Sequence, residues 1–289
     1  MKDFQKNVSK RVKMKAFVVA EIGSNWEGDP KKAQSIIKEC KKAGADAVKF
    51  QMWRAKDLYE KSHPNWKKIV KSELTFEKAK QIKKIADKNH IEFFCSVFYS
   101  EGVDFLESIG VKKYKIASRT CLQKDPYSSE TLKRLSLTKK SIFISMGMGG
   151  NKKKIRQIFK KNKPVFCYCI SEYPLEFKKI KWNQAVKYDG FSDHTEGIVA
   201  PILYCILKKQ KKIKWDEAVK YDGFSDHTEG IVAPILYCIL KNRKKTKSVY
   251  IEKHIKLKNS KGPDAGVSID TEKFQEMISY IRTIEKIKI

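Results

Sequence analysis

Short apolar segments alternate with amphipathic segments along almost the whole chain, and this alternation constrains the fold more than any other feature. The apolar segments have the length of strands, and the amphipathic segments repeat their apolar residues at helical spacing. We expect strands at 16–22, 46–51, 91–97, 112–117, 141–146, 164–170, 188–193 and 248–253, and helices at 30–43, 75–89, 101–109, 128–138, 150–161, 176–187, 197–208 and 271–286. Eight alternating units in about 250 residues predict a parallel sheet closed into a (β/α)8 barrel.

A tandem duplication adds a further unit. Residues 178–210 and 211–243 are copies of one 33-residue segment that differ at four positions, and GFSDHTEGIVAPILYCILK at 190–208 recurs unchanged at 223–241. A closed barrel of eight strands has no place for a ninth strand, so we expect one copy to be extruded or to pack outside. The expected fold class is α/β: one TIM-barrel domain over residues 1–289 with one extra duplicated βα unit.

The chain is strongly basic, with 62 Lys and Arg against 33 Asp and Glu and a formal net charge of +29. Such a charge can indicate a polyanionic partner. The lysines run along the whole chain, however, and no helix-turn-helix, zinc-finger or aromatic RNA-binding signature accompanies them. We therefore interpret them as solvated helix faces, and we do not expect a nucleic-acid partner.

Cysteine usage and the N-terminus predict a cytoplasmic location. The seven cysteines are scattered and odd in number, which is typical of reduced thiols and not of a disulfide framework. No apolar run reaches the length of a membrane span, and the basic segment MKDFQKNVSKRVKMK lacks the apolar core of a secretory signal. We expect no membrane association.

Polar residues follow almost every expected strand, at the end where barrel enzymes hold their chemistry. They are Glu21, Lys49, Gln51, Ser96, Lys115, Ser118, Ser145, Ser171, Tyr173, Ser192-Asp193-His194 or its duplicate Ser225-Asp226-His227, Glu252-Lys253-His254, and Asp264. One histidine from each of the last two barrel strands could share a divalent metal. Lysines and serines from earlier strands could hold a phosphate and a carboxylate.

Several of these segments, in the same order, resemble the sialic acid synthase (N-acetylneuraminate synthase) family of barrels. The resemblance covers the chain from about residue 15 onwards. The matching segments are AEIGSNWEGD (20–29), VKFQ (48–51), YKIAS (114–118), SMGM (145–148), CISEYP (169–174), GFSDHTEG, IEKHIKL (251–257) and GPDAGVSID (262–270).

The resemblance implies a transferase that condenses phosphoenolpyruvate with an N-acylated amino sugar such as N-acetylmannosamine. The product would be a nine-carbon sialic-acid-type keto sugar acid, with phosphate released. By the same resemblance, His194 and His254 would bind Mn²⁺ or Mg²⁺, and Glu21 would act as general base on the attacking water. The substrate-binding residues would be Lys49, Lys115, Ser118, Ser145 and Ser192 for phosphoenolpyruvate, and Gln51, Tyr173, Glu252 and Asp264 for the sugar.

The duplication leaves two choices for the seventh strand. If the first copy supplies it, the extra segment lies at the bottom of the barrel, away from the chemistry, so Ser192 and His194 are the preferred pair. Ser225 and His227 of the second copy are the alternates.

Departures from the family pattern leave other functions open. Trp26 and Ser171 stand where many members have His and Asn, and full-length bacterial members continue into an antifreeze-like domain that we do not expect in this chain, which ends at Ile289. Family members also lead us to expect a possible homodimer. The alternatives are a catalytically impaired barrel that acts as a binding or assembly module, and a phosphoenolpyruvate aldol-type synthase for another sugar.

Overall fold

Parallel strands close into a barrel in the computed structural model, which describes residues 14–195, 199–210, 222–228, 230–242 and 248–287. Each strand pairs with its neighbour in sequence, and β9 pairs back with β1 from Lys15–Ser248 to Glu21–His254. The barrel strands are β1 (Lys15–Gly23), β2 (Ala47–Met52), β3 (Glu92–Val97), β4 (Lys113–Ile116), β5 (Ser141–Ser145), β6 (Val165–Tyr168), β7 (Gly190–Asp193), β8 (Asp222–Asp226) and β9 (Ser248–Lys256). A two-residue strand, β10 (Ile269–Asp270), pairs in parallel with the end of β9 at Ile255 and Lys256.

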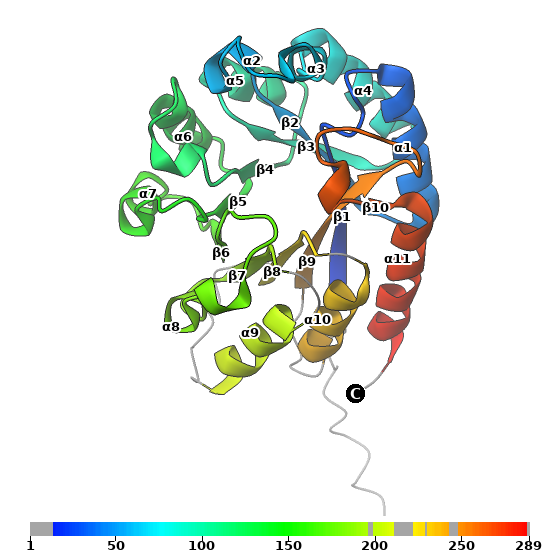
Figure 1. Cartoon of the computed structure of the whole chain (residues 1–289), viewed down its shortest axis with the longest axis vertical. Coiled ribbons are helices and arrows are strands. Elements are labelled where there is room, and N and C mark those ends of the chain that lie inside the picture. Colours follow the sequence, from blue (N-terminus) through cyan, green and yellow to red (C-terminus); the bar gives the residue numbers. More distant parts are fainter. Residues whose placement is uncertain (1–13, 196–198, 211–221, 229, 243–247, 288–289) are drawn as a thin grey trace, which may run out of the picture.

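Helices surround the strands on the outside (Figure 1). They are α1 (Pro30–Ala43), α2 (Ala55–Leu58), α3 (Trp66–Lys71), α4 (Phe76–Lys88), α5 (Ser100–Ser108), α6 (Ser128–Leu137), α7 (Lys152–Ile158), α8 (Trp182–Ala185), α9 (Val199–Gln210), α10 (Val232–Asn242) and α11 (Thr271–Lys286). Short 3-10 turns lie at η1 (Thr120–Leu122), η2 (Phe177–Lys179) and η3 (Ala265–Val267).

Local sequence explains where the principal helices begin and what they bury. Asp29 caps α1 by accepting from the backbone N–H of Lys31, and Thr75 and Asp270 cap α4 and α11 in the same way. One face of α11 is buried against the barrel, with an apolar stripe of Phe274, Met277, Ile278, Ile281 and Ile284. Burial of such a stripe attaches the last helix to the outside of β1 and β9.

The α/β barrel class and its strands are confirmed, and each expected strand lies within a few residues of an observed one. The helix expected at 176–187 is wrong. That segment instead forms η2 and the single turn α8, separated by Ile180 in an extended conformation. Ile180 is buried, and the backbone N–H of Lys181 donates to the Tyr168 hydroxyl, so contacts with the barrel override the local helical pattern.

The expectation that one copy of the repeat lies outside the barrel is also wrong. Copy one supplies β7 and copy two supplies β8, and both belong to the closed sheet that the described residues form. Their pairing is in register, with Phe191 opposite Phe224, Ser192 opposite Ser225 and Asp193 opposite Asp226. The exact period-two alternation is the same in both copies, so each presents the same residues to the interior and can serve as a barrel strand.

Close backbone packing lets the additional strand enter the barrel. β7 pairs with β6 through Cys167–Gly190 and Tyr168–Phe191, a shorter ladder than the one from Asp222–Val249 to Asp226–Lys253 between β8 and β9. A Cβ at Gly190 would lie 2.4 Å from the carbonyl oxygen of Gly223. Only glycine fits at this position of β7.

The remaining expectations concern location and surface charge. All seven cysteines lie among the described residues, where they are buried and form no disulfide. No helix in the described ranges is both long and apolar enough to cross a bilayer. Residues 1–13, 196–198 and 229, which include the basic N-terminal segment and part of both GFSDHTEG motifs, lie outside the described residues.

The two repeat glycines offer a matched test of the extra strand. We expect Gly190→Ala to destabilise the protein by about 1–3 kcal/mol, because its Cβ would overlap the backbone of β8. Gly223→Ala is the control, because its Cβ would meet Val165 and Cys167 side-chain atoms at 3.4 and 3.5 Å, which is ordinary contact. Urea unfolding measures both, and equal effects of the two substitutions would contradict this packing of β7 against β8.

Candidate active site

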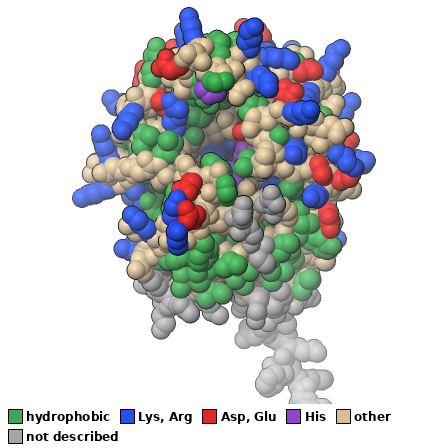
Figure 2. Space-filling model, in the orientation of Figure 1, with side chains coloured by type: hydrophobic (Ala, Val, Ile, Leu, Met, Phe, Trp, Pro, Cys, Tyr) green, Lys and Arg blue, Asp and Glu red, His purple; other side chains and the backbone are tan. Residues whose placement is uncertain are grey.

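A cavity of about 510 Å³ opens at the carboxyl ends of the strands. Figure 2 shows it as a hollow with histidine and basic side chains inside, while lysines and arginines are spread around the visible rim. Predicted residues line it from many strands: Lys49, Gln51, Lys115, Ser118, Ser145, Tyr173, Ser192, His194, Glu252, His254 and Asp264, together with His227 of the second copy. Glu21 and Ser225 are buried directly beneath, in contact with these residues.

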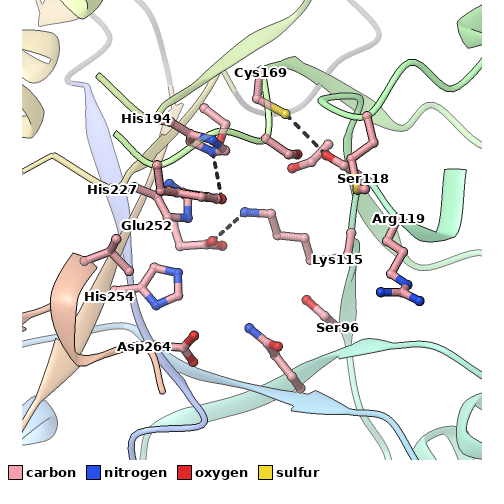
Figure 3. A pocket seen from close by; sticks show the side chains of 18 of the residues that line it. Ser96, Lys115, Ser118, Arg119, Cys169, His194, His227, Glu252, His254 and Asp264 are labelled. Atoms are coloured by element: carbon pink, nitrogen blue, oxygen red, sulfur yellow. Dashed lines mark hydrogen bonds and ion pairs between the residues drawn. The ribbon is translucent and has the colours of Figure 1, made fainter. Parts of the chain in front are cut away.

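Alternating charges form a buried network at the floor of this cavity. Lys49 forms an ion pair with Glu21 and lies 3.8 Å from Glu252. Lys115 forms a second ion pair with Glu252 (Figure 3). All four residues are at most 7% exposed. Burial of such charges is favourable only when each is paired and hydrogen-bonded, and the alternation of sign provides this pairing.

The two carboxylates of the network differ in their pKa values. Burial raises the pKa of Glu21 to about 7, although Lys49 acts in the opposite direction. Burial also acts to raise the pKa of Glu252, but Lys115 and Lys49 together outweigh it and hold that pKa at about 2. A carboxyl group with a pKa near neutrality can exchange a proton during a reaction, whereas Glu252 remains a fixed negative charge.

The two copies of the Ser-Asp-His motif have different neighbours. Ser225 in β8 lies beside β9, so its hydroxyl donates to Glu252 at 3.0 Å and accepts from Lys115 at 3.1 Å. Ser192 in β7 lies opposite Ser225, and its hydroxyl contacts His194 at 3.3 Å. The second copy is therefore joined to the charge network, while the first copy is one strand removed from it.

The aspartates of the motif differ in the same way. Asp226 forms a fully buried ion pair with Lys253 of β9, with an Oδ2–Nζ distance of 2.8 Å. Asp193 lies opposite Asp226, and its Oδ2 is buried without a hydrogen-bond partner. Burial raises the pKa of Asp193 to about 7, and the neighbouring Asp226 charge acts in the same direction.

Aromatic rings form a row along one wall of the cavity. The ring centroids of His194 and His227 are 4.4 Å apart, those of His227 and His254 are 4.8 Å apart, and Tyr173 stacks on His194 at 4.2 Å. Burial lowers the pKa of His194 and His254 to about 3 and that of His227 well below its ordinary value. The three imidazoles are therefore neutral near pH 7.

Neutral imidazoles with unused ring nitrogens suit a metal ion. The Nδ1 atoms of His194, His227 and His254 are all buried without hydrogen-bond partners. A buried polar atom of this kind is rare unless it serves a ligand or ion. Within the described residues, no group of three or more His, Cys, Asp and Glu side chains is arranged to hold a metal. The donors present therefore fit a centre with two protein ligands, completed by oxygen atoms of substrate or water.

Serine hydroxyls and a cation occupy the wall opposite the histidines. Ser118 accepts a hydrogen bond from the backbone N–H of Gly147 at 2.8 Å and contacts the Cys169 thiol at 3.4 Å. Ser96 accepts from the Lys49 ammonium at 3.2 Å, and Arg119 lines the mouth of the cavity while paired with Asp125. Together with Lys115, these donors make this wall suitable for an anionic ligand.

The loop after β9 closes the remaining side of the cavity. Asp264 accepts a hydrogen bond from the backbone N–H of Ser24 at 2.7 Å, and burial raises the pKa of its carboxyl. Gly23, the last residue of β1, has a φ of +51°. A Cβ on Gly23 would lie 2.4 Å from Asp264 Oδ2. The glycine that follows Glu21-Ile22 is thus required both by its backbone conformation and by the position of Asp264.

Comparison with known proteins identifies the family. The model of the NeuB family matches residues 36–207 and 200–288. This chain belongs to the NeuB family. An uncharacterised protein of Methanocaldococcus jannaschii is 31% identical over 284 residues, covering 93% of this chain and 71% of that protein. The N,N'-diacetyllegionaminic acid synthase of Campylobacter jejuni is 29% identical over 301 residues, covering 94% of this chain and 77% of the relative.

A solved structure supports the fold. The N-acetylneuraminic acid (sialic acid) synthetase of Leptospira borgpetersenii, in complex with citrate, superposes with a TM-score of 0.68 at 22% identity, covering 93% of this chain and 84% of that chain. The prediction of a transferase-type condensing enzyme is confirmed at the level of this enzyme class.

Several residues of this NeuB-family site were not among those predicted to act in it. Lys253 stabilises Asp226 from outside the barrel, and the sequence shows it only as a residue between two expected site residues. Arg119 follows the YKIAS segment directly, and this adjacency is the one signal that could have indicated it. Ser96 was noted at a strand end without a role, and its contact with Lys49 places it at the cavity.

The two aspartates provide a test of their different surroundings. Asp226→Asn should destabilise the metal-free protein by about 3–5 kcal/mol, because Lys253 is left buried without a carboxylate. Asp193→Asn should stabilise it by about 2 kcal/mol at pH 8, because the charge of ionised Asp193 is buried beside that of Asp226 and its Oδ2 has no hydrogen-bond partner.

The sign of this pH dependence follows from the raised pKa. The folded state binds the Asp193 proton more tightly than the unfolded state, so wild-type stability falls as pH rises from about 4 to the folded value of about 7. The gain from Asp193→Asn should accordingly shrink towards zero at pH 5. Urea unfolding with EDTA at both pH values measures these changes, and a destabilising Asp193→Asn would contradict the assignment.

Proposed function

We propose that this chain condenses phosphoenolpyruvate with an N-acylated amino sugar of the N-acetylmannosamine type, giving a nine-carbon keto sugar acid and phosphate. The observation that carries the proposal is the arrangement of the cavity: cations and serines lie on one wall, neutral histidines lie on the other, and Glu21 is buried beneath the floor in contact with Lys49. Membership of the NeuB family and a relative named as a legionaminic acid synthase support it.

Phosphoenolpyruvate would bind along the cationic wall. Lys49 and Lys115 approach from adjacent sides of the floor, and Ser96 and Ser118 face the same region. These donors match the phosphate and carboxylate groups of the substrate. Because Glu252 stays ionised between the lysines, it keeps both ammonium groups oriented before the substrate enters.

The sugar aldehyde would bind at the histidine wall, where His227 and His254 would hold Mn²⁺ or Mg²⁺. Sequence reasoning preferred His194 for this role with His227 as alternate; geometry favours the alternate, because His227 lies between His194 and His254. A bound divalent cation would supply Lewis acidity at the aldehyde oxygen. The aldehyde carbon then becomes the electrophile for C3 of phosphoenolpyruvate.

Glu21 would act on the water. As C3 forms the new carbon–carbon bond, water adds to C2. Glu21 accepts one proton from this water, and this proton balances the one that the aldehyde oxygen takes up to become a hydroxyl, while Gln51, which donates to Glu21 at 3.1 Å, fixes the carboxylate. The bond from C2 to the phosphate oxygen then breaks and the second proton of the water leaves the C2 hydroxyl with the phosphate, which gives the keto group; Lys49 and Lys115 offset the charge of the leaving anion.

The charge network also supports an active enzyme over an impaired binding module. Although the barrel carries an additional strand, Ser225 of the second copy keeps its contacts with Lys115 and Glu252. The direct test is phosphate release from phosphoenolpyruvate with Mn²⁺ and N-acetylmannosamine, with the product mass read from the same reaction. Sugar-dependent release with a nine-carbon keto acid is the expected result, and a product of another length would favour an aldol-type synthase for a different sugar.

The metal assignment predicts different effects of the two repeat histidines. His227→Ala should weaken Mn²⁺ binding at least tenfold, as expected for loss of one of two protein ligands, while His194→Ala should change it less than twofold. Electron paramagnetic resonance of free Mn²⁺ measures the affinity without turnover. The reverse order of effects would assign the metal to the first copy.

The raised pKa of Glu21 predicts the acid limb of the pH profile. A general base must be ionised, so kcat/KM should rise tenfold per pH unit below about 7 and level off above it. Glu21→Gln should lower kcat by about 10²–10⁴-fold and abolish this limb. Steady-state assays from pH 5.5 to 8.5 test it, and an unchanged profile in the variant would remove Glu21 from the role of base.

A further inference from the structure

We propose that His194, from the first copy of the repeat, is a positioning residue that holds Tyr173 against the acceptor sugar. The idea rests on the proposed function and gives the first copy a role that an unduplicated barrel would not contain. It is carried by three observations: the ring stack of His194 on Tyr173, the hydrogen bond between them, and the hydrogen bond from the Leu175 N–H to the His194 carbonyl, which holds the loop after Tyr173.

The His194 side chain contacts Tyr173 at the cavity mouth and Ser192 of β7, the strand that it follows. Its Nε2 lies 3.2 Å from the Tyr173 hydroxyl and 3.3 Å from the Ser192 hydroxyl, and its ring stacks on Tyr173 at an interplanar angle of 21°. Its backbone carbonyl also accepts from the Leu175 N–H at 2.7 Å. The first copy thus holds both the side chain of Tyr173 and the loop that follows it.

Tyr173 is placed to meet the part of the acceptor that projects from the metal ligands. It lines the cavity, yet 51% of its surface is exposed at the mouth. His227 alone would hold it less well, since those two rings are 5.4 Å apart and tilted by 59°. The rings of His254, His227 and His194 follow one another along this wall (Figure 3). A sugar whose aldehyde lies at His227 and His254 and that extends along this row would therefore reach Tyr173, which stacks on His194.

A buried histidine keeps Tyr173 in one orientation by two separable contacts. The stack restricts the ring plane, and the hydrogen bond restricts the hydroxyl. An exposed tyrosine without these contacts would sample several rotamers and would lose that freedom on binding, which weakens affinity. His194 therefore acts on acceptor binding through Tyr173, and not on the metal or on phosphoenolpyruvate.

The test is acceptor binding without turnover. Titration calorimetry of N-acetylmannosamine into the full-length, Mn²⁺-loaded protein in the absence of phosphoenolpyruvate gives the dissociation constant. We expect His194→Ala to raise it about tenfold, the combined size of one aromatic contact and one hydrogen bond. His194→Phe, which keeps the stack, and His194→Gln, which keeps a hydrogen-bonding group, should each recover part of the loss.

A double-mutant cycle shows whether His194 acts through Tyr173. In a Tyr173→Ala background, His194→Ala should change acceptor affinity less than twofold, because the residue it positions is gone. Thermal unfolding and Mn²⁺ affinity of each variant report whether the barrel and the metal ligands are intact. If His194→Ala destabilises the fold, the acceptor affinities of His194→Phe and His194→Gln are compared with that of the wild type instead.

The outcomes separate this inference from the proposed function. Unchanged acceptor affinity in His194→Ala, additive effects in the cycle, or loss of Mn²⁺ binding as large as in His227→Ala would each overturn the positioning role. Absence of acceptor binding to the wild-type protein would overturn it as well. If the wild type makes the nine-carbon product but His194→Ala leaves acceptor affinity unchanged, the synthase function stands and the positioning role is rejected. If His194→Ala binds the acceptor tenfold more weakly but the wild type makes no product, the positioning role stands and the synthase function is rejected.

Discussion

Closure of the barrel between β1 and β9 is the constraint on which the site depends. The pairing from Lys15–Ser248 to Glu21–His254 joins the first and last strands of a chain whose intervening strands pair only with their neighbours. It brings Glu21 and Lys49 of the first two strands next to Glu252. Without closure these charges would lie at opposite edges of an open sheet, and burial of each alone would be strongly unfavourable. The fold and the charge network therefore stabilise each other.

Identical sequences acquire different roles because their neighbours differ. Each barrel strand pairs with the strand that follows it in the chain. The second copy (β8) therefore pairs with β9, whereas the first copy (β7) pairs with β8. Asp226 finds Lys253, while Asp193 finds Asp226. Ser225 joins the charge network, while Ser192 contacts His194. The two copies thus differ in their contacts because one lies beside β9 and the other lies beside β6 and β8.

Sequence reasoning located most of the cavity because strand ends in a parallel barrel converge on one face. The residues at those ends, from Lys49 to Asp264, line the cavity as expected from their positions in the chain. It failed where tertiary contacts override local pattern. The segment 176–187 has helical spacing, yet burial of Ile180 and the bond from Lys181 to Tyr168 hold part of it extended. Lys253 was passed over because a lysine between two site residues has no local feature that indicates a buried partner.

The sequence by itself determined the strand and helix pattern, the barrel class, the polar residues at the strand ends and the existence of two equivalent copies. These features follow from the hydrophobic periodicity and the residues of each segment, which can be recognised without knowing what lies beside that segment in the fold. The tertiary structure decided that both copies enter the barrel, because strand pairing and the fit of Gly190 against Gly223 depend on atoms far apart in the chain. It also decided which histidine lies beside His254, since two identical motifs can be distinguished only by what surrounds them.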